Sequence, residues 1–148
     1  MSEALAHPPQ RLVGRLLMTV ATLMYSLVPV VVDFTETHVF HPDWTPHARF
    51  HMVWLLGLLC GVAVVSLYFI WRFEADRVFG RRMATGLGLL ALMSFYASAA
   101  TARLYGGALA DTGGVAPIFG IDANVLSFTL CAVLLLSGSR LARHRESG

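Results

Sequence analysis

Residues 51–71 read HMVWLLGLLCGVAVVSLYFIW and contain no Asp, Glu, Lys or Arg. A bilayer core about 30 Å thick is crossed by about 20 mostly apolar residues in one α-helix. This stretch therefore predicts a membrane-spanning helix. Three further stretches of similar length and character lie at residues 12–32, 83–102 and 117–139.

The four predicted spans are joined by short connections, so consecutive helices should run antiparallel. We therefore predict an all-α integral membrane protein, an up-down four-helix bundle that forms a single domain over residues 1–148. Two pairs of small residues, Gly57 with Gly61 and Ser94 with Ser98, have the spacing that lets neighbouring helices in lipid approach closely.

The composition excludes several other classes of protein. Of the 148 residues, 56% are hydrophobic and 14% are charged, against about a quarter charged in an ordinary soluble domain. Such hydrophobicity argues against a disordered chain, and two cysteines are too few for a disulfide-rich module. The net charge of +2 argues against nucleic acid as a partner. We expect the partners to be the lipid bilayer and either a second copy, forming a homodimer, or another membrane protein.

All 11 basic residues are arginines, and their distribution predicts the orientation because positive charge is retained on the cytoplasmic side. Nine flank one set of span ends: Arg11, Arg15, Arg72, Arg77, Arg81, Arg82, Arg140, Arg143 and Arg145. Only Arg49 and Arg103 flank the other set. Both termini are therefore predicted to be cytoplasmic. The expected location is the cell membrane, as a multi-pass protein of the bacterial inner membrane.

The loop after the first span is the richest segment in groups that carry chemistry. It contains four of the six histidines, His38, His41, His47 and His51, together with Asp33, Glu36 and Asp43. Thr45 followed by Pro46 predicts a helix start, because threonine caps helices and proline is favoured at the first helical position. In such a helix the four-residue spacing places His47 and His51 on one face.

Two histidines at that spacing can bind one metal ion, with His38 or His41 as further ligands. Imidazole and carboxylate donors favour zinc or non-haem iron over copper(I) or an iron–sulfur cluster. Two other interpretations stay open. One is a hydrogen-bonded cap without metal, and the other is a proton-responsive loop, because imidazole titrates near neutral pH.

Three charged residues lie near the predicted outer ends of the spans. Asp33 ends the first, Arg103 ends the third, and Asp122 lies about one turn into the fourth. Because buried charges are usually paired, one interpretation is a polar network of Arg103 with Asp33 or Asp122. The alternative is separate placement at the membrane interface, where arginine side chains extend toward water.

Two stripes of mainly polar residues extend from these charges into the first and third spans. The first consists of Thr22, Ser26, Pro29 and Asp33, and the second of Ser94, Ser98 and Thr101. These stripes could line a cavity that opens toward the histidine loop. The alternative is that each hydroxyl bonds to its own helix backbone or to a neighbouring helix.

The loop HPDWTPHARFH, residues 41–51, resembles the signature of an uncharacterised family of small bacterial membrane proteins with four spans. The resemblance implies the four-span architecture and no activity. More loosely, the layout is similar to DoxX-type proteins and to the sterol-isomerase-related EXPERA domain. EXPERA enzymes use acidic residues inside the bundle to move protons on a lipophilic substrate, whereas no glutamate lies within a predicted span here.

Two functions of different class follow. The first is a membrane protein whose outward polar site binds a metal, a lipophilic ligand or a partner. The alternative is a compact membrane enzyme acting on a lipophilic substrate. There His47 and His51 would be metal ligands or acid–base groups, oriented by the charged residues Asp33, Arg103 and Asp122. A transporter ranks third, because one four-helix chain would have to dimerise to enclose a pathway.

Overall fold

The computed structural model describes residues 7–110 and 115–143, and this part of the chain is helical with no β-strand. Its elements are α1 (His7–Asp33), α2 (Pro46–Trp71), α3 (Arg77–Thr101), a short 3-10 helix η1 (Ala102–Leu104) and α4 (Ala123–Leu141). Among the described residues, four helices are long and apolar enough to cross a membrane. This result confirms the all-α prediction with four helices of membrane-spanning length.

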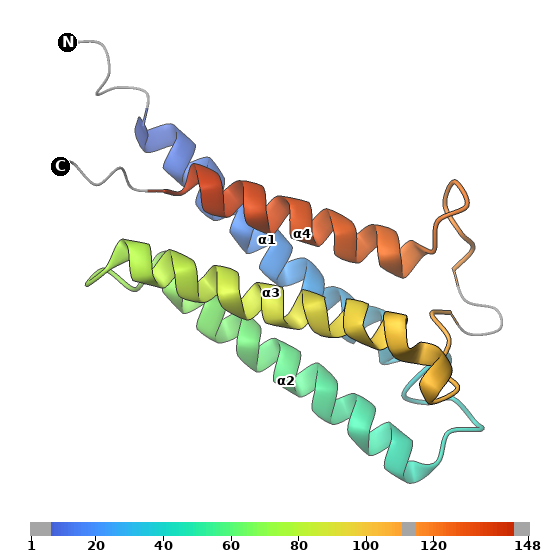
Figure 1. The fold of residues 1–148 in the computed structure, drawn as a ribbon. Helices are drawn as coiled ribbons and strands as arrows, with labels where there is room; N and C mark the ends of the chain where they lie inside the picture. The colour runs from blue at the N-terminus through green and yellow to red at the C-terminus, as the bar shows by residue number, and fades with distance from the viewer. Residues whose placement is uncertain (1–6, 111–114, 144–148) are drawn as a thin grey trace, which may run out of the picture.

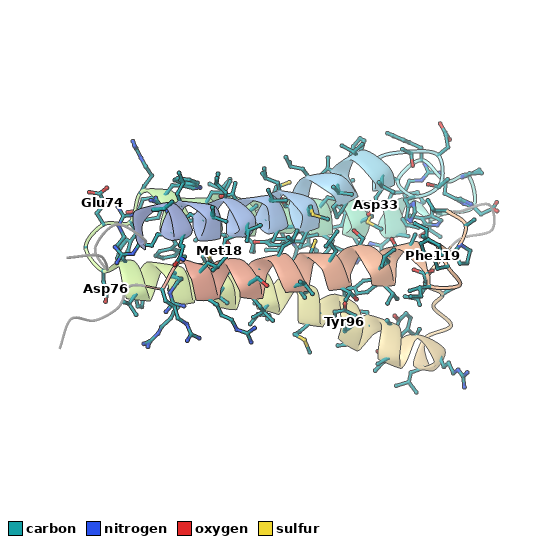
Figure 2. The ribbon with its side chains drawn as sticks, turned by 90° about the horizontal axis from the view of Figure 1, so that it is seen from above. Met18, Asp33, Glu74, Asp76, Tyr96 and Phe119 are labelled. Atoms are coloured by element: carbon teal, nitrogen blue, oxygen red, sulfur yellow. The ribbon has the colours of Figure 1, made fainter. Side chains whose placement is uncertain are left out.

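Consecutive helices alternate in direction, as Figure 1 shows. The start of α1, the α2–α3 turn and the end of α4 lie at one end of the bundle, which we call the arginine end. Residues 34–45, 105–110 and 115–122 lie at the other, which we call the histidine end. Figure 2 shows Glu74 and Asp76 at the arginine end and Asp33 and Phe119 toward the histidine end.

Two helix starts follow directly from their capping residues. The Thr45 hydroxyl accepts a hydrogen bond from the Ala48 amide at 3.2 Å, and Pro46 is the first residue of α2, as predicted. The Asp76 carboxylate accepts from the Phe79 amide at 2.8 Å and starts α3 at Arg77. Both helices therefore begin five or six residues before the predicted spans, because counting apolar residues omits a polar first turn.

The predicted start of the fourth span at residue 117 is wrong. In residues 117–122 the backbones of Ile118 and Ile121 bond each other, and Phe119 and Gly120 have φ angles of 53° and 78°, which an α-helix does not allow. Asp122 caps α4 instead of lying within it. Its carboxylate accepts hydrogen bonds from the amides of Asn124 at 2.8 Å and Val125 at 3.3 Å.

The closest helix crossing joins α1 to α4 at two glycines. A Cβ added at Gly138 would lie 2.7 Å from the Gly14 carbonyl oxygen, and one added at Gly14 would lie 2.6 Å from the Gly138 carbonyl oxygen. The predicted close approach at Gly57 and Gly61 is not found, because an added Cβ at either meets nothing within 4 Å. The homodimer or partner protein expected from the sequence stays a prediction.

The interior holds both apolar and hydroxyl-bearing side chains. Its largest buried members are Tyr25, Met18, Leu92 and Leu135, listed in order of volume. The buried hydroxyls of Thr22 and Ser26 donate to backbone carbonyls one turn earlier on α1, at 2.8 and 2.7 Å. For these two residues the self-bonding interpretation of the first stripe is confirmed.

Large apolar side chains also cover the outside of every helix. Val31, Val64 and Met93 are 59% to 75% exposed, and each lies on a different helix. Contiguous apolar surface of this extent is rare on soluble monomers. Facing lipid tails it is the expected exterior of a membrane-spanning bundle, and with four apolar helices it indicates a small multi-pass membrane protein.

Candidate functional site

A cavity of about 550 Å³ lies among all four helices in the half of the bundle nearest the histidine end. Apolar side chains from each helix form most of its wall. They include Met24, Val28 and Val32 of α1, Leu55, Leu59 and Val62 of α2, Leu87, Leu90 and Phe95 of α3, and Phe128 and Cys131 of α4. The rings of Phe95 and Phe128 stack with centroids 3.9 Å apart where α3 meets α4.

Asp33 and His38 bring polar atoms to this cavity. The His38 Nε2 atom lies 3.7 Å from a carboxylate oxygen of Asp33, and the two side chains are 32% and 22% exposed. Backbone geometry holds them together, because the Val39 amide donates to the Asp33 carbonyl at 3.0 Å and so folds the loop back over the end of α1. We call these two residues the Asp33–His38 pair.

Part of the predicted polar stripes lines the same cavity. Pro29 and Asp33 of the first stripe contribute to its wall, as do Ser94 and Ser98 of the second. Ser94 also donates to the Leu90 carbonyl at 2.8 Å, and Thr101 donates to the Ala97 carbonyl at 2.7 Å, so these hydroxyls are bonded to their own helix as well.

Asn124 and Ser127 of α4 also line the cavity, and Ser127 was missed from the sequence. Asn124 also donates to the Leu109 carbonyl at 2.9 Å, which ties the segment before α4 to the first turn of that helix. Apolar periodicity predicts which face of a helix points inward. It does not predict where a cavity remains between packed helices, so it does not identify the residues that line one.

The other three histidines of the loop lie away from the cavity. The His41 Nδ1 atom accepts a hydrogen bond from the Asp43 amide at 3.2 Å, and its carbonyl accepts from Arg49 at 2.9 Å. His47 and His51 are exposed on the first turns of α2, with their Nε2 atoms 3.0 Å apart. The loop is thus extensively hydrogen-bonded, as the cap interpretation expects.

The predicted metal ligands do not gather into one cluster. Within the described ranges, no three His, Cys, Asp or Glu side chains lie close enough together to hold a metal ion. His47 and His51 form a two-ligand arrangement, while His38 faces Asp33 and His41 bonds within its own turn. Zinc or non-haem iron at this pair would have to take its remaining ligands from outside this group.

The three charged residues proposed as a network are held apart. Asp33 faces His38, and Asp122 is occupied in capping α4. Arg103 is an exposed residue of η1, and no ion pair among the described residues joins it to either acid. Asp33 and Asp122 therefore each meet a local partner, whereas the buried Nε of Arg49 has no hydrogen-bond partner among the described residues.

A family model described as a family of unknown function, DUF6640, matches residues 17–148. The chain belongs to this family. Comparison with curated proteins and with solved structures gives no match. The matched range contains the cavity, the Asp33–His38 pair and the whole histidine loop. Membership of DUF6640 confirms the prediction that the chain belongs to an uncharacterised family. The bacterial source, the loop signature and the similarity to DoxX and EXPERA stay predictions.

Proposed function

We propose that this protein binds a lipophilic small molecule in the cavity of the histidine end. The observation that carries the proposal is the mainly apolar cavity of about 550 Å³ among the four helices, with the Asp33–His38 pair at its wall. Small-molecule sites have volumes of about 300–1,000 Å³ and combine apolar walls with a few polar groups that fix the orientation of the ligand.

The polar pair indicates the chemistry of the ligand. A carboxylate accepts hydrogen bonds, and an imidazole can donate or accept. A ligand with a long apolar body and a hydroxyl at one end would place its body among the leucine, valine and phenylalanine side chains. Its hydroxyl could then donate to Asp33 and accept from His38.

Binding is favoured over acid–base catalysis by one distance. His38 Nε2 lies 3.7 Å from the Asp33 carboxylate, which exceeds hydrogen-bond length. His38 Nδ1 lies 2.9 Å from the Thr37 hydroxyl, so the imidazole is held by Thr37 and not by the carboxylate. The membrane enzyme stays the alternative function.

The two exposed histidines give a second candidate function, the binding of a divalent cation. Two nitrogen ligands of one zinc ion, each about 2.0–2.1 Å from the metal, lie about 3 Å or slightly more apart. The 3.0 Å between the Nε2 atoms of His47 and His51 is close to this separation. With water as the remaining ligands, such a site would be weak and open to the outside.

We also propose that the protein resides in a bacterial inner membrane with the arginine end in the cytoplasm. The support is the distribution of nine arginines against two. A reporter that is active only outside the cytoplasm should stay silent when fused after Gly148. Strong activity of that fusion would reverse the orientation.

The cavity is tested by filling it. Ser94 lines the cavity from α3, whereas Ala97, one turn further along the same helix, is exposed and does not. In lipid nanodiscs, Ser94→Phe should reduce binding of a fluorescent long-chain alcohol about tenfold, while Ala97→Phe should leave it unchanged. Equal binding by the two variants would refute the proposed function.

A further inference from the structure

A second cavity, of about 330 Å³, lies at the opposite end of the bundle and is surrounded by arginines. The guanidinium-bearing residues Arg11 and Arg15 line it from α1, and Arg77 and Arg81 line it from α3. Met18 and Ile70 contribute apolar wall. None of the described residues that line this cavity is acidic. We call it the arginine cavity.

Arg15 is held rigidly at the wall by the end of α2. Its Nε and Nη2 atoms donate to the carbonyls of Ile70 at 2.9 Å and Trp71 at 3.1 Å. Its guanidinium carbon lies 4.2 Å from the centroid of the Trp71 ring, and that indole donates to the Thr19 hydroxyl at 2.8 Å. The position of this charge is therefore fixed before any ligand arrives.

Arg81 and Arg77 each keep a buried donor for which no described residue supplies an acceptor. Arg81 donates through Nη1 to the Ser139 hydroxyl at 3.1 Å, but its buried Nε has no hydrogen-bond partner. Arg77 donates through Nη2 to Glu74 at 3.0 Å, and its buried Nη1 has no partner. Buried donors in native proteins are nearly always paired, so two unpaired guanidinium donors beside one cavity indicate a missing acceptor.

The missing acceptor must also be an anion. Glu74 is the acid paired with Arg77, and its side chain is 78% exposed. Guanidinium groups gathered around one cavity repel one another, and an anion bound among them relieves that repulsion. The planar fork of arginine matches the oxygens of phosphate, which can accept from several guanidinium groups at once.

We propose that the arginine cavity binds a phosphate group, carried either by a membrane phospholipid or by a soluble phosphorylated compound. The volume of about 330 Å³ is at the lower limit for small-molecule sites, so it accommodates a phosphate with part of the molecule attached to it. Arg77 and Arg81 donate to the phosphate oxygens through the atoms that are otherwise unpaired. Met18 and Ile70 contact the attached apolar part.

The test compares two ligands and two neighbouring arginines. Titration calorimetry of the full chain in detergent measures binding of a short-chain phosphatidic acid and, separately, of glycerol 3-phosphate. Arg77→Gln and Arg81→Gln should each weaken binding about tenfold, since each removes a hydrogen bond to a charged group. Arg82→Gln removes the same charge from an exposed neighbour outside the cavity wall and should change binding less than about twofold.

The two ligands distinguish the two possible sources of the phosphate group. Binding of phosphatidic acid alone assigns the site to a phospholipid, and equal binding of glycerol 3-phosphate assigns it to a soluble compound. Failure of both ligands to bind, or an equal loss in all three variants, would overturn the proposal. If Arg81→Gln loses its fold together with its bond to Ser139, Arg77→Gln decides the outcome, since the side chain of Arg77 bonds to the exposed Glu74.

Discussion

The two ends of the bundle are built from side chains of different size. Near the arginine end, Gly14 and Gly138 bring the backbones of α1 and α4 together, and Gly80 lets the start of α3 approach the end of α2. In the other half, larger residues such as Met24, Phe95 and Phe128 line the cavity of the histidine end. In Figure 1, α2, α3 and α4 spread apart toward the histidine end. One end thus holds the helices close together around the arginine cavity of about 330 Å³, and the other leaves a larger cavity of about 550 Å³.

The largest expected effect tests the close packing near the arginine end. A methyl group added at Gly138 would lie 2.7 Å from the Gly14 carbonyl oxygen and 2.9 Å from the Met18 amide nitrogen. Because both atoms belong to the backbone, α1 must move away from α4. We expect Gly138→Ala to lower the free energy of unfolding by about 2 kcal/mol, measured by thermal unfolding in detergent.

Gly61→Ala is the matched control for that variant. It adds the same methyl group to an exposed helical glycine that has nothing within 4 Å, so its unfolding temperature should stay the same or rise slightly. If both variants unfold at the same temperature, the crossing of α1 and α4 does not hold the bundle together.

The next effect concerns the link between α1 and α2. Arg15→Gln removes the donors to Ile70 and Trp71 and the contact with the Trp71 ring. We expect a loss of about 1.5 kcal/mol in unfolding free energy, because hydrogen bonds from charged groups exceed neutral ones in strength. The exposed Arg82→Gln should unfold like the unmodified chain, and an equal loss there would point to net charge as the cause.

A smaller effect, on ligand affinity and not on stability, is expected at the histidine end. Asp33→Asn replaces a carboxylate acceptor by an amide, which should weaken binding of a long-chain alcohol about fivefold. Binding of an alkane of the same length, which lacks the hydroxyl, should not change. Asp43→Asn alters an exposed acid of the same loop outside the cavity wall and serves as the control. Equal losses for both probes would show that Asp33 does not contact the polar end of the ligand.

The smallest effect belongs to the exposed histidines. A His47→Ala/His51→Ala double variant should lose the weak zinc binding expected of the unmodified protein, because it removes both nitrogen ligands. His38→Ala/His41→Ala removes two histidines of the same loop and should retain zinc. Calorimetric titration with zinc distinguishes the two, and retention by the first variant would rule out the two-histidine site.

The sequence predicts the helices well because long apolar runs and caps are local signals. Thr45 and Pro46 define the start of α2 without any tertiary information. The start of α4 could not be placed in the same way, since the apolar residues Ile118 and Phe119 extend the hydrophobic run although their turn is not helical. Only the carboxylate of Asp122, read as a cap, would have indicated the true boundary.

The sites depend on how helices pack, and this is why the sequence predicts them only in part. Asp33, Ser94 and Ser98 line the cavity, as one interpretation of the polar stripes expected. Arg103 and Asp122 do not join Asp33, because Arg103 lies exposed on η1 and Asp122 caps α4. The arginine cavity was not foreseen at all. Counting arginines by side of the membrane shows orientation but not that Arg15, Arg77 and Arg81 surround one space.

The most direct test of the central claim is photolabelling of the reconstituted protein with a long-chain alcohol that carries a diazirine. Peptide mapping should place the label on cavity residues such as Val28, Leu59 and Phe95, and excess unlabelled alcohol should remove it. Label spread evenly over lipid-facing residues such as Val64 and Met93, without competition, would contradict a ligand site at the histidine end.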